Sequence, residues 1–196
     1  MSNYWLIIVG YFIGSIPFSY IVGRLWAGID IRRCGSGNVG MTNVWRNAGP
    51  AAGITALVLD LGKGVLAVWL AGQYGNDLIV ALSGIAVLAG HSWPVFLGFK
   101  GGKLVATGVG VITAISPPVG ISAMLIWIVV TGLTRYVSVG SITAIVLIPF
   151  LIFAFKLGTP FLALGLFAAI FAIYKHVPNI KRLLAGTEPR IVFKKN

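Results

Sequence analysis

The chain has 196 residues, of which 58% are hydrophobic and only 10% are charged. A soluble domain averages about 25% charged residues, so this composition excludes an ordinary soluble domain and indicates a membrane protein. The formal charge of +11 comes from 15 Lys and Arg against 4 Asp and Glu; it would suggest nucleic-acid binding in a soluble protein, but in a membrane protein it is the usual excess of basic residues in cytoplasmic loops.

The hydrophobic residues fall into runs of the length that crosses a bilayer, which is about 20 residues for a helix. The sequence therefore predicts an all-α membrane protein, a bundle of seven transmembrane helices in a single domain over residues 1–196. In chain order the predicted segments are 4–23, 53–73, 78–98, 104–116, 118–134, 141–157 and 160–177. The fourth of these, 104–116, is short for a full span.

Basic residues alternate along the connections between these segments. The connections after segments one, three and five, together with the tail, hold 13 of the 15 Lys and Arg. Because basic loops stay in the cytoplasm, the N-terminus is predicted outside and the C-terminus in the cytoplasm. The same topology brings four polar stretches of the chain to the cytoplasmic face of the membrane.

The first polar stretch is GSGNVGMTNVWR, residues 35–46. Its glycines permit positive φ and close backbone approach, successive N–H groups in such turns bind anions, and an arginine fork suits phosphate. The alternative is a glycine-rich connection in which Asn and Thr only cap helices. The predicted phosphate-binding residues are Ser36, Asn38, Thr42, Asn43 and Arg46.

The second stretch is HSWPVFLGFKGGKLVATG, residues 91–108. Flexible glycines between two cations, just before a helix start, again favour an anion, although two lysines at a membrane surface also serve as simple anchors. The predicted phosphate-binding residues are Lys100, Gly101, Gly102 and Lys103. His91, near the end of an apolar helix, is equally consistent with a hydrogen-bonded structural role and a catalytic one.

The third stretch is RYVSVGS, residues 135–141. Ser138 is predicted to cap the following helix, and Ser141 to cap it or to reach a substrate oxygen. The fourth is YKHVPNIKRLLAGTEPR, residues 174–190.

In this last stretch His176 and Asn179 are three residues apart, a spacing that shares a face in a helix, but Pro178 predicts a bend between them. His176 is an acid–base or donor candidate. Glu188 is the only acid of the tail, and a salt bridge to a loop arginine is its expected role.

The few acidic residues limit the chemistry. No carboxylate pair suits glycoside hydrolysis, and Asp60 is expected to pair with Lys63 inside segment two rather than to join a metal site. We therefore expect neither a metal nor a cofactor.

Four motifs in order, GSGNVGMTNVWR, HSWPVFLGFKGGK followed by VATG, RYVSVGSI and HVPNIKRLLAGTE, resemble those of the bacterial acyl-phosphate:glycerol-3-phosphate acyltransferases. The resemblance covers nearly the whole chain. In one departure Leu104 follows Lys103, where the family usually has a glycine, which puts the local backbone shape and substrate affinity in question.

The resemblance implies a multi-pass enzyme of the bacterial inner membrane with its active site at the cytoplasmic face. It would transfer a fatty acyl group from acyl phosphate to the 1-hydroxyl of glycerol 3-phosphate, giving lysophosphatidic acid and phosphate, the first committed step of phospholipid synthesis. The implied partners are glycerol 3-phosphate, fatty acyl phosphate, membrane lipids and, transiently, the enzyme that makes the acyl phosphate, with no nucleic acid.

Motif matching assigns catalytic roles to His176, Asn179 and Ser141. Either His176 or a substrate phosphate would take the hydroxyl proton, and the absence of paired carboxylates favours the substrate. Three alternatives are a transporter for a phosphorylated metabolite, a serine hydrolase that uses Ser141 and His176, and a non-enzymatic membrane protein. A transporter would place its site near the membrane midplane, whereas these motifs lie at one face.

Overall fold

A computed structural model describes residues 3–191, and in this range the chain is entirely helical and loop. Lys194 and Lys195 of the basic tail lie outside the described residues. The elements are α1 (Trp5–Ser15), α2 (Phe18–Ala27), η1 (Ile31–Arg33), α3 (Met41–Ala48), α4 (Pro50–Tyr74), α5 (Asp77–Ser92), η2 (Val95–Leu97), α6 (Val105–Ile115), α7 (Pro117–Thr134), α8 (Val137–Ala154) and α9 (Thr159–Leu184).

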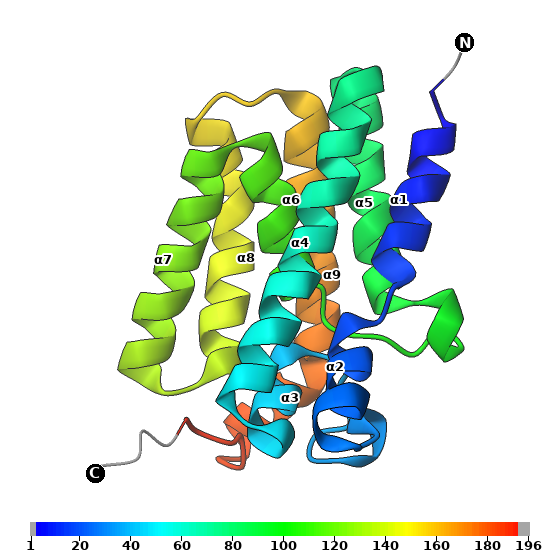
Figure 1. The fold of residues 1–196 in the computed structure, drawn as a ribbon. Helices are drawn as coiled ribbons and strands as arrows, with labels where there is room; N and C mark the ends of the chain where they lie inside the picture. Colours follow the sequence, from blue (N-terminus) through cyan, green and yellow to red (C-terminus); the bar gives the residue numbers. More distant parts are fainter. Residues whose placement is uncertain (1–2, 192–196) are drawn as a thin grey trace.

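Within residues 3–191, six apolar stretches are long enough to cross a membrane. The first predicted segment is interrupted at Pro17, which ends α1 and lets α2 begin in a new direction (Figure 1). The fourth predicted segment becomes α6, an 11-residue helix of about 16 Å at 1.5 Å per residue. The all-helical membrane architecture is therefore confirmed, while α6 by itself is too short to span a bilayer core of about 30 Å.

From α4 to α9, successive α-helices of the bundle alternate in direction (Figure 1). In this bundle α1 lies against α5, α4 against α5 and α6, and α8 between α7 and α9. Glycine makes the closest crossing possible, because a side chain at Gly110 of α6 would collide with the carbonyl oxygen of Leu61 on α4. α6 consequently sits deep between α4 and α7.

One end of the bundle collects the polar stretches. The short elements α2, η1 and α3 lie at the end where α9 terminates, opposite the end where α1 begins (Figure 1). The outer faces of the long helices carry exposed apolar side chains such as Leu133, Phe153 and Ile170, which are 82%, 75% and 70% exposed. Such faces are expected to contact lipid.

The predicted bend at Pro178 was wrong. α9 continues without interruption from Thr159 to Leu184, so proline costs this helix one backbone hydrogen bond without ending it. His176 and Asn179 therefore do share a face, and both are buried.

Candidate active site

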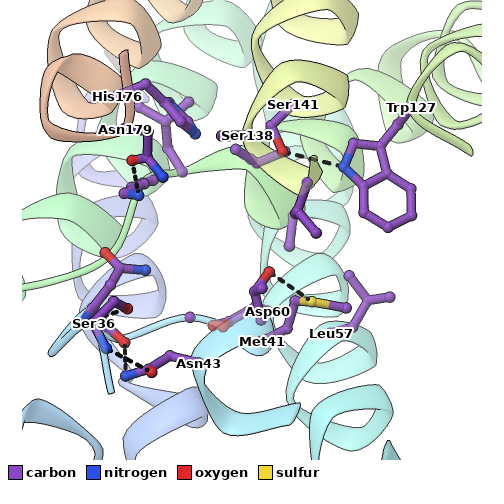
Figure 2. A pocket seen from close by; sticks show the side chains of 18 of the residues that line it. Ser36, Met41, Asn43, Leu57, Asp60, Trp127, Ser138, Ser141, His176 and Asn179 are labelled. Atoms are coloured by element: carbon purple, nitrogen blue, oxygen red, sulfur yellow. Dashed lines mark hydrogen bonds between the residues drawn. The ribbon is translucent and has the colours of Figure 1, made fainter. Parts of the chain in front are cut away.

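A cavity of about 730 Å³ lies where α3, α4, α6, α7, α8 and α9 converge. Figure 2 shows His176 and Asn179 on one side, Ser138, Ser141 and Trp127 on another, and Ser36 and Asn43 along a third. All four polar stretches contribute residues to its wall, and the first contributes most of its length. The predicted residues in its wall are Ser36, Asn38, Thr42, Asn43, Arg46, His91, Lys103, Ser141, His176, Asn179 and Glu188.

The glycine-rich loop is organised by Asn43, which is 2% exposed. Its amide nitrogen donates to three backbone oxygens, those of Ile31 at 3.0 Å, Cys34 at 3.0 Å and Asn38 at 3.1 Å. Its amide oxygen accepts from the Ser36 N–H at 3.1 Å. Because both the oxygen and the nitrogen of this amide are occupied, Asn43 fixes the conformation of the loop. It has no free N–H for the phosphate contact that was predicted for it.

The rest of this loop is more open. Ser36 and Arg46 are exposed at the cavity edge, and the Ser36 hydroxyl accepts from the N–H of Asn38 at 3.4 Å. The Thr42 hydroxyl donates to the sulfur of Met41 at 3.3 Å. Among the described residues, Arg46 donates only to the carbonyl oxygen of Pro189, at 3.3 Å. Its remaining guanidinium donors are thus available to an anion.

His176 on α9 is held in one tautomer. Its Nδ1 lies 2.7 Å from the carbonyl oxygen of Ala172, and because a carbonyl oxygen can only accept, Nδ1 carries the hydrogen. In the neutral ring Nε2 is then a free acceptor. The residue is 3% exposed and lines the cavity, so this acceptor is shielded from bulk water.

Asn179, one turn further along α9, connects two charged residues. Its amide oxygen accepts from Nζ of Lys103, and its amide nitrogen donates to Glu188 at 2.7 Å. Glu188 also forms an ion pair with Arg182 at 2.7 Å. The predicted salt bridge of Glu188 is confirmed, although its partner lies in the last turn of α9 and not in a loop.

The charges in this network shift two pKa values. Burial, with the like charges of Arg182 and Arg46 close by, lowers the pKa of Lys103 to about 8, and Glu188 only partly offsets this. Burial would raise the pKa of Glu188, but the hydrogen bond from Asn179 and the contact with Arg182 hold it below its usual value. Lys103 is therefore a cation that a bound phosphate would stabilise.

Ser141 on α8 has a different kind of partner. Its hydroxyl oxygen accepts from the indole Nε1 of Trp127 at 3.1 Å, which leaves the O–H free to donate. The prediction that Ser138 caps α8 was wrong, because that helix begins at Val137 and has no side-chain cap bond. Ser138 instead lies inside the first turn and lines the cavity.

The second polar stretch divides between two locations. Lys103 reaches the cavity, whereas Lys100 is exposed outside it. Gly101 and Gly102 are also absent from the cavity wall, and their N–H groups donate to the carbonyl oxygens of Ser92 at 3.2 Å and His91 at 3.1 Å. The backbone N–H groups of these two glycines are therefore occupied within the protein and are not available to a phosphate.

Leu104 stands where the family usually has a glycine, and it adopts the backbone conformation that a glycine would favour. It adopts the left-handed conformation with φ of 60°, which glycine takes freely and other residues take at a cost of about 1 kcal/mol. Its side chain is fully buried in the main apolar core. The backbone shape is thus retained, and side-chain burial offsets the strain.

Three residues of the cavity wall were not predicted from the sequence as site residues. Asp60 was expected only as the partner of Lys63, Arg182 only as a basic neighbour, and Trp127 was one more apolar residue of α7. The 3.0 Å pair of Asp60 with Lys63 is confirmed. An acidic residue in the middle of an apolar helix was the available signal for Asp60; no pattern marked Trp127.

Away from its charged end the cavity is apolar. Side chains from α4, α6 and α7 form this part of the wall, and those of α7 are also partly exposed on the outer surface of the bundle. The apolar lining residues include Leu57, Leu61, Val109, Met124, Trp127 and Ile128. A molecule with an anionic head and a hydrocarbon tail fits such a division.

Comparisons with known proteins match the chain over nearly its full length. Residues 4–186 match the model of the family described as glycerol-3-phosphate acyltransferase. The glycerol-3-phosphate acyltransferase of Desulforamulus reducens is 48% identical over all of this chain and 98% of the relative. That of Thermotoga petrophila is 45% identical over 96% of this chain and 97% of the relative.

Two crystal structures of PlsY, an integral membrane glycerol 3-phosphate acyltransferase, share the fold. Each is 39% identical to this chain and covers 96% of it, with 94% of the PlsY chain aligned. The glycerol 3-phosphate form superposes with a TM-score of 0.92, and the lysophosphatidic acid form with 0.90.

Proposed function

The chain belongs to the glycerol-3-phosphate acyltransferase family, and we propose that it transfers a fatty acyl group from acyl phosphate to the 1-hydroxyl of glycerol 3-phosphate. The products are lysophosphatidic acid and inorganic phosphate. The observation that carries the proposal is one cavity that joins the free Nε2 of His176 to the cations of Arg46, Lys103 and Arg182.

Two phosphate groups must be held in this reaction, one on each substrate. The three cations supply charge for both, and Arg46 has guanidinium donors to spare. Ser36, Asn38 and Thr42 lie beside Arg46 in the wall as neutral donors. Charged donors of this kind form the strongest hydrogen bonds to phosphate oxygens.

The acyl group is already activated as a mixed anhydride, so the reaction needs positioning and a proton acceptor rather than a covalent nucleophile. The 1-hydroxyl oxygen attacks the acyl carbon, the bond from that carbon to the phosphate oxygen breaks, and phosphate leaves. Before the attack, His176 Nε2 accepts a hydrogen bond from the 1-hydroxyl of the bound substrate and orients it. As the bond to the acyl carbon forms, the hydroxyl releases this hydrogen to an oxygen of the departing phosphate, whose second pKa is about 6, in a substrate-assisted step that needs no metal or cofactor.

The carbonyl oxygen gains negative charge as the hydroxyl attacks. Ser141 can donate to it, because its own oxygen is already engaged by Trp127 at 3.1 Å. Donors placed where charge develops contribute most to such reactions. Asn179 fixes Lys103 and Glu188 on the opposite wall.

The apolar part of the cavity is where the fatty chain lies in this proposal. Leu57 and Leu61 of α4 and Met124 and Ile128 of α7 line it. Since the exposed faces of these helices lie in lipid, acyl phosphate and product can exchange with the membrane by the same side.

We further propose that the protein works in a bacterial inner membrane as one domain, with its N-terminus outside and its cavity at the cytoplasmic face. In the seven passes of this proposal, the short α6 crosses together with the non-helical residues directly before it. The single cysteine, Cys34, lies in the loop at this end and is half-buried. A membrane-impermeant thiol reagent should label Cys34 in inverted vesicles and spare it in right-side-out cells; the reverse pattern would overturn the orientation.

One assay tests the reaction. Purified protein in lipid receives acyl phosphate and radiolabelled glycerol 3-phosphate, and labelled lysophosphatidic acid is the expected product. Acyl-CoA in place of acyl phosphate tests the donor, and product formed from it at an equal rate would refute the donor assignment. Uptake of the label into vesicles without product would favour a transporter.

A further inference from the structure

A group of buried polar side chains begins in the cavity wall with Asp60 and His91 and extends behind it to Lys63, and the proposed reaction assigns it no role. Asp60 and Lys63 of α4 and His91 of α5 are 1%, 3% and 7% exposed. Ser19 of α2 is 1% exposed and donates to Asp60 Oδ2 at 2.6 Å. Buried charges within an apolar bundle are costly and are usually retained for a purpose.

The Lys63 ammonium is held by two backbone carbonyl oxygens and by an ion pair with Asp60. Its Nζ contacts the carbonyl oxygens of Gly14 and Ile16, both at 2.9 Å, and Asp60 Oδ1 at 3.0 Å. The two carbonyl oxygens belong to the end of α1, just before Pro17 interrupts the chain. Lys63 and Asp60 thereby fix α1 and α2 to α4.

His91 connects this group to the lysine loop. Its Nδ1 lies 3.6 Å from Asp60 Oδ1, and its carbonyl oxygen accepts from the N–H of Gly102 at 3.1 Å. A side chain at Gly102 would collide with Nε2 of His91 on one side and with the carbonyl oxygen of Val39 on the other.

Gly102 is thus enclosed between the imidazole ring and the glycine-rich loop. The next residue is Lys103, whose ammonium reaches the cavity and contacts Asn179. Because the backbone is fixed at Gly102, the point from which the Lys103 side chain extends into the cavity is also fixed.

We propose that Asp60, Lys63 and His91 form a positioning unit that acts through Gly102 to place Lys103 in the cavity wall. Asp60 orients the ring, the ring fixes Gly102, and Gly102 sets the start of the lysine side chain. The inference rests on the proposed function only in taking Lys103 as a ligand of substrate phosphate. None of the three residues needs to touch substrate for this role.

The position of Lys103 can be measured without turnover. An amine-reactive acylating reagent modifies only the neutral amine, so its rate against pH, read by mass spectrometry on the Lys103 peptide, gives the midpoint of that lysine. Buried beside Arg46, Arg182, Glu188 and His176, Lys103 has its pKa lowered to about 8. If Lys103 is released toward water, its pKa should rise toward the ordinary lysine value of 10.5.

The variants are His91→Ala, which removes the ring beside Gly102, and His91→Asn, which keeps a side-chain N–H for Asp60. Ser83→Ala is the matched control, because Ser83 is also buried on α5 and its hydroxyl contacts no partner among the described residues. We expect His91→Ala to raise the labelling midpoint by at least one pH unit and to raise the glycerol 3-phosphate KM more than it lowers kcat, with His91→Asn between it and the wild type.

An unchanged midpoint and KM in folded His91→Ala, with only a lower melting temperature, would overturn the inference. If His91→Ala does not fold, His91→Asn decides by the same two readings. A His91-dependent midpoint in a protein that makes no lysophosphatidic acid would sink the proposed function and leave the positioning unit standing.

Discussion

Replacing Lys103 by arginine should abolish a pH dependence of substrate binding that the wild type shows. With a pKa of about 8, Lys103 is about nine-tenths protonated at pH 7 and about one-tenth at pH 9. Substrate phosphates, with a second pKa near ~6, stay dianionic over this range. Affinity that depends on the lysine charge is therefore present below pH 8 and lost above it, and the glycerol 3-phosphate KM should rise about tenfold, or about 1.4 kcal/mol.

The assay measures initial rates of lysophosphatidic acid formation between pH 7 and 9 in lipid. In Lys103→Arg the guanidinium stays charged throughout, so its KM, whatever its absolute value, should stay flat. Lys156→Arg is the control, because Lys156 is an exposed residue between α8 and α9 outside the cavity wall, and it should keep the tenfold rise. If Lys103→Arg shows the same rise as the wild type, another group titrates and the reasoning fails.

Three further predictions concern single side chains. His176→Ala should lower kcat by about 10- to 100-fold, because it loses only the acceptor that orients the hydroxyl; a loss well above 100-fold, within the roughly 10²- to 10⁴-fold that a general base contributes, would make His176 the base. Leu104→Gly relieves about 1 kcal/mol of backbone strain but loses a fully buried leucine worth about 2–5 kcal/mol, so chemical denaturation should show net destabilisation while KM changes little; a more stable variant would contradict this balance. Asn43→Ala leaves three backbone oxygens without their donor and should cost about 1–3 kcal/mol of stability, whereas an unchanged melting curve with weaker phosphate binding would return Asn43 to the ligands.

The sequence predicted most of what depends on local pattern, with the bend at Pro178 and the cap at Ser138 as exceptions. Long apolar runs predict membrane helices because the bilayer thickness fixes their length, and the structure differs mainly at Pro17 and in the short α6. The spacing of Asp60 and Lys63 identified their ion pair, since residues three apart on a helix are neighbours. The four polar stretches stood out because such residues are poor at spanning lipid.

Tertiary structure alone decided what each polar group does within those stretches. Asn43 and Ser36 are both polar residues of the same stretch, but the backbone oxygens of Ile31, Cys34 and Asn38 occupy the Asn43 amide. The sequence predicted that Gly102 belongs to a phosphate-binding loop. In the structure it is enclosed by His91 and Val39, which depends on how α5 packs against the loop before α3. Local pattern fixes which segments enter the membrane, whereas the availability of a donor depends on partners far away in the chain, which only the packed bundle brings together.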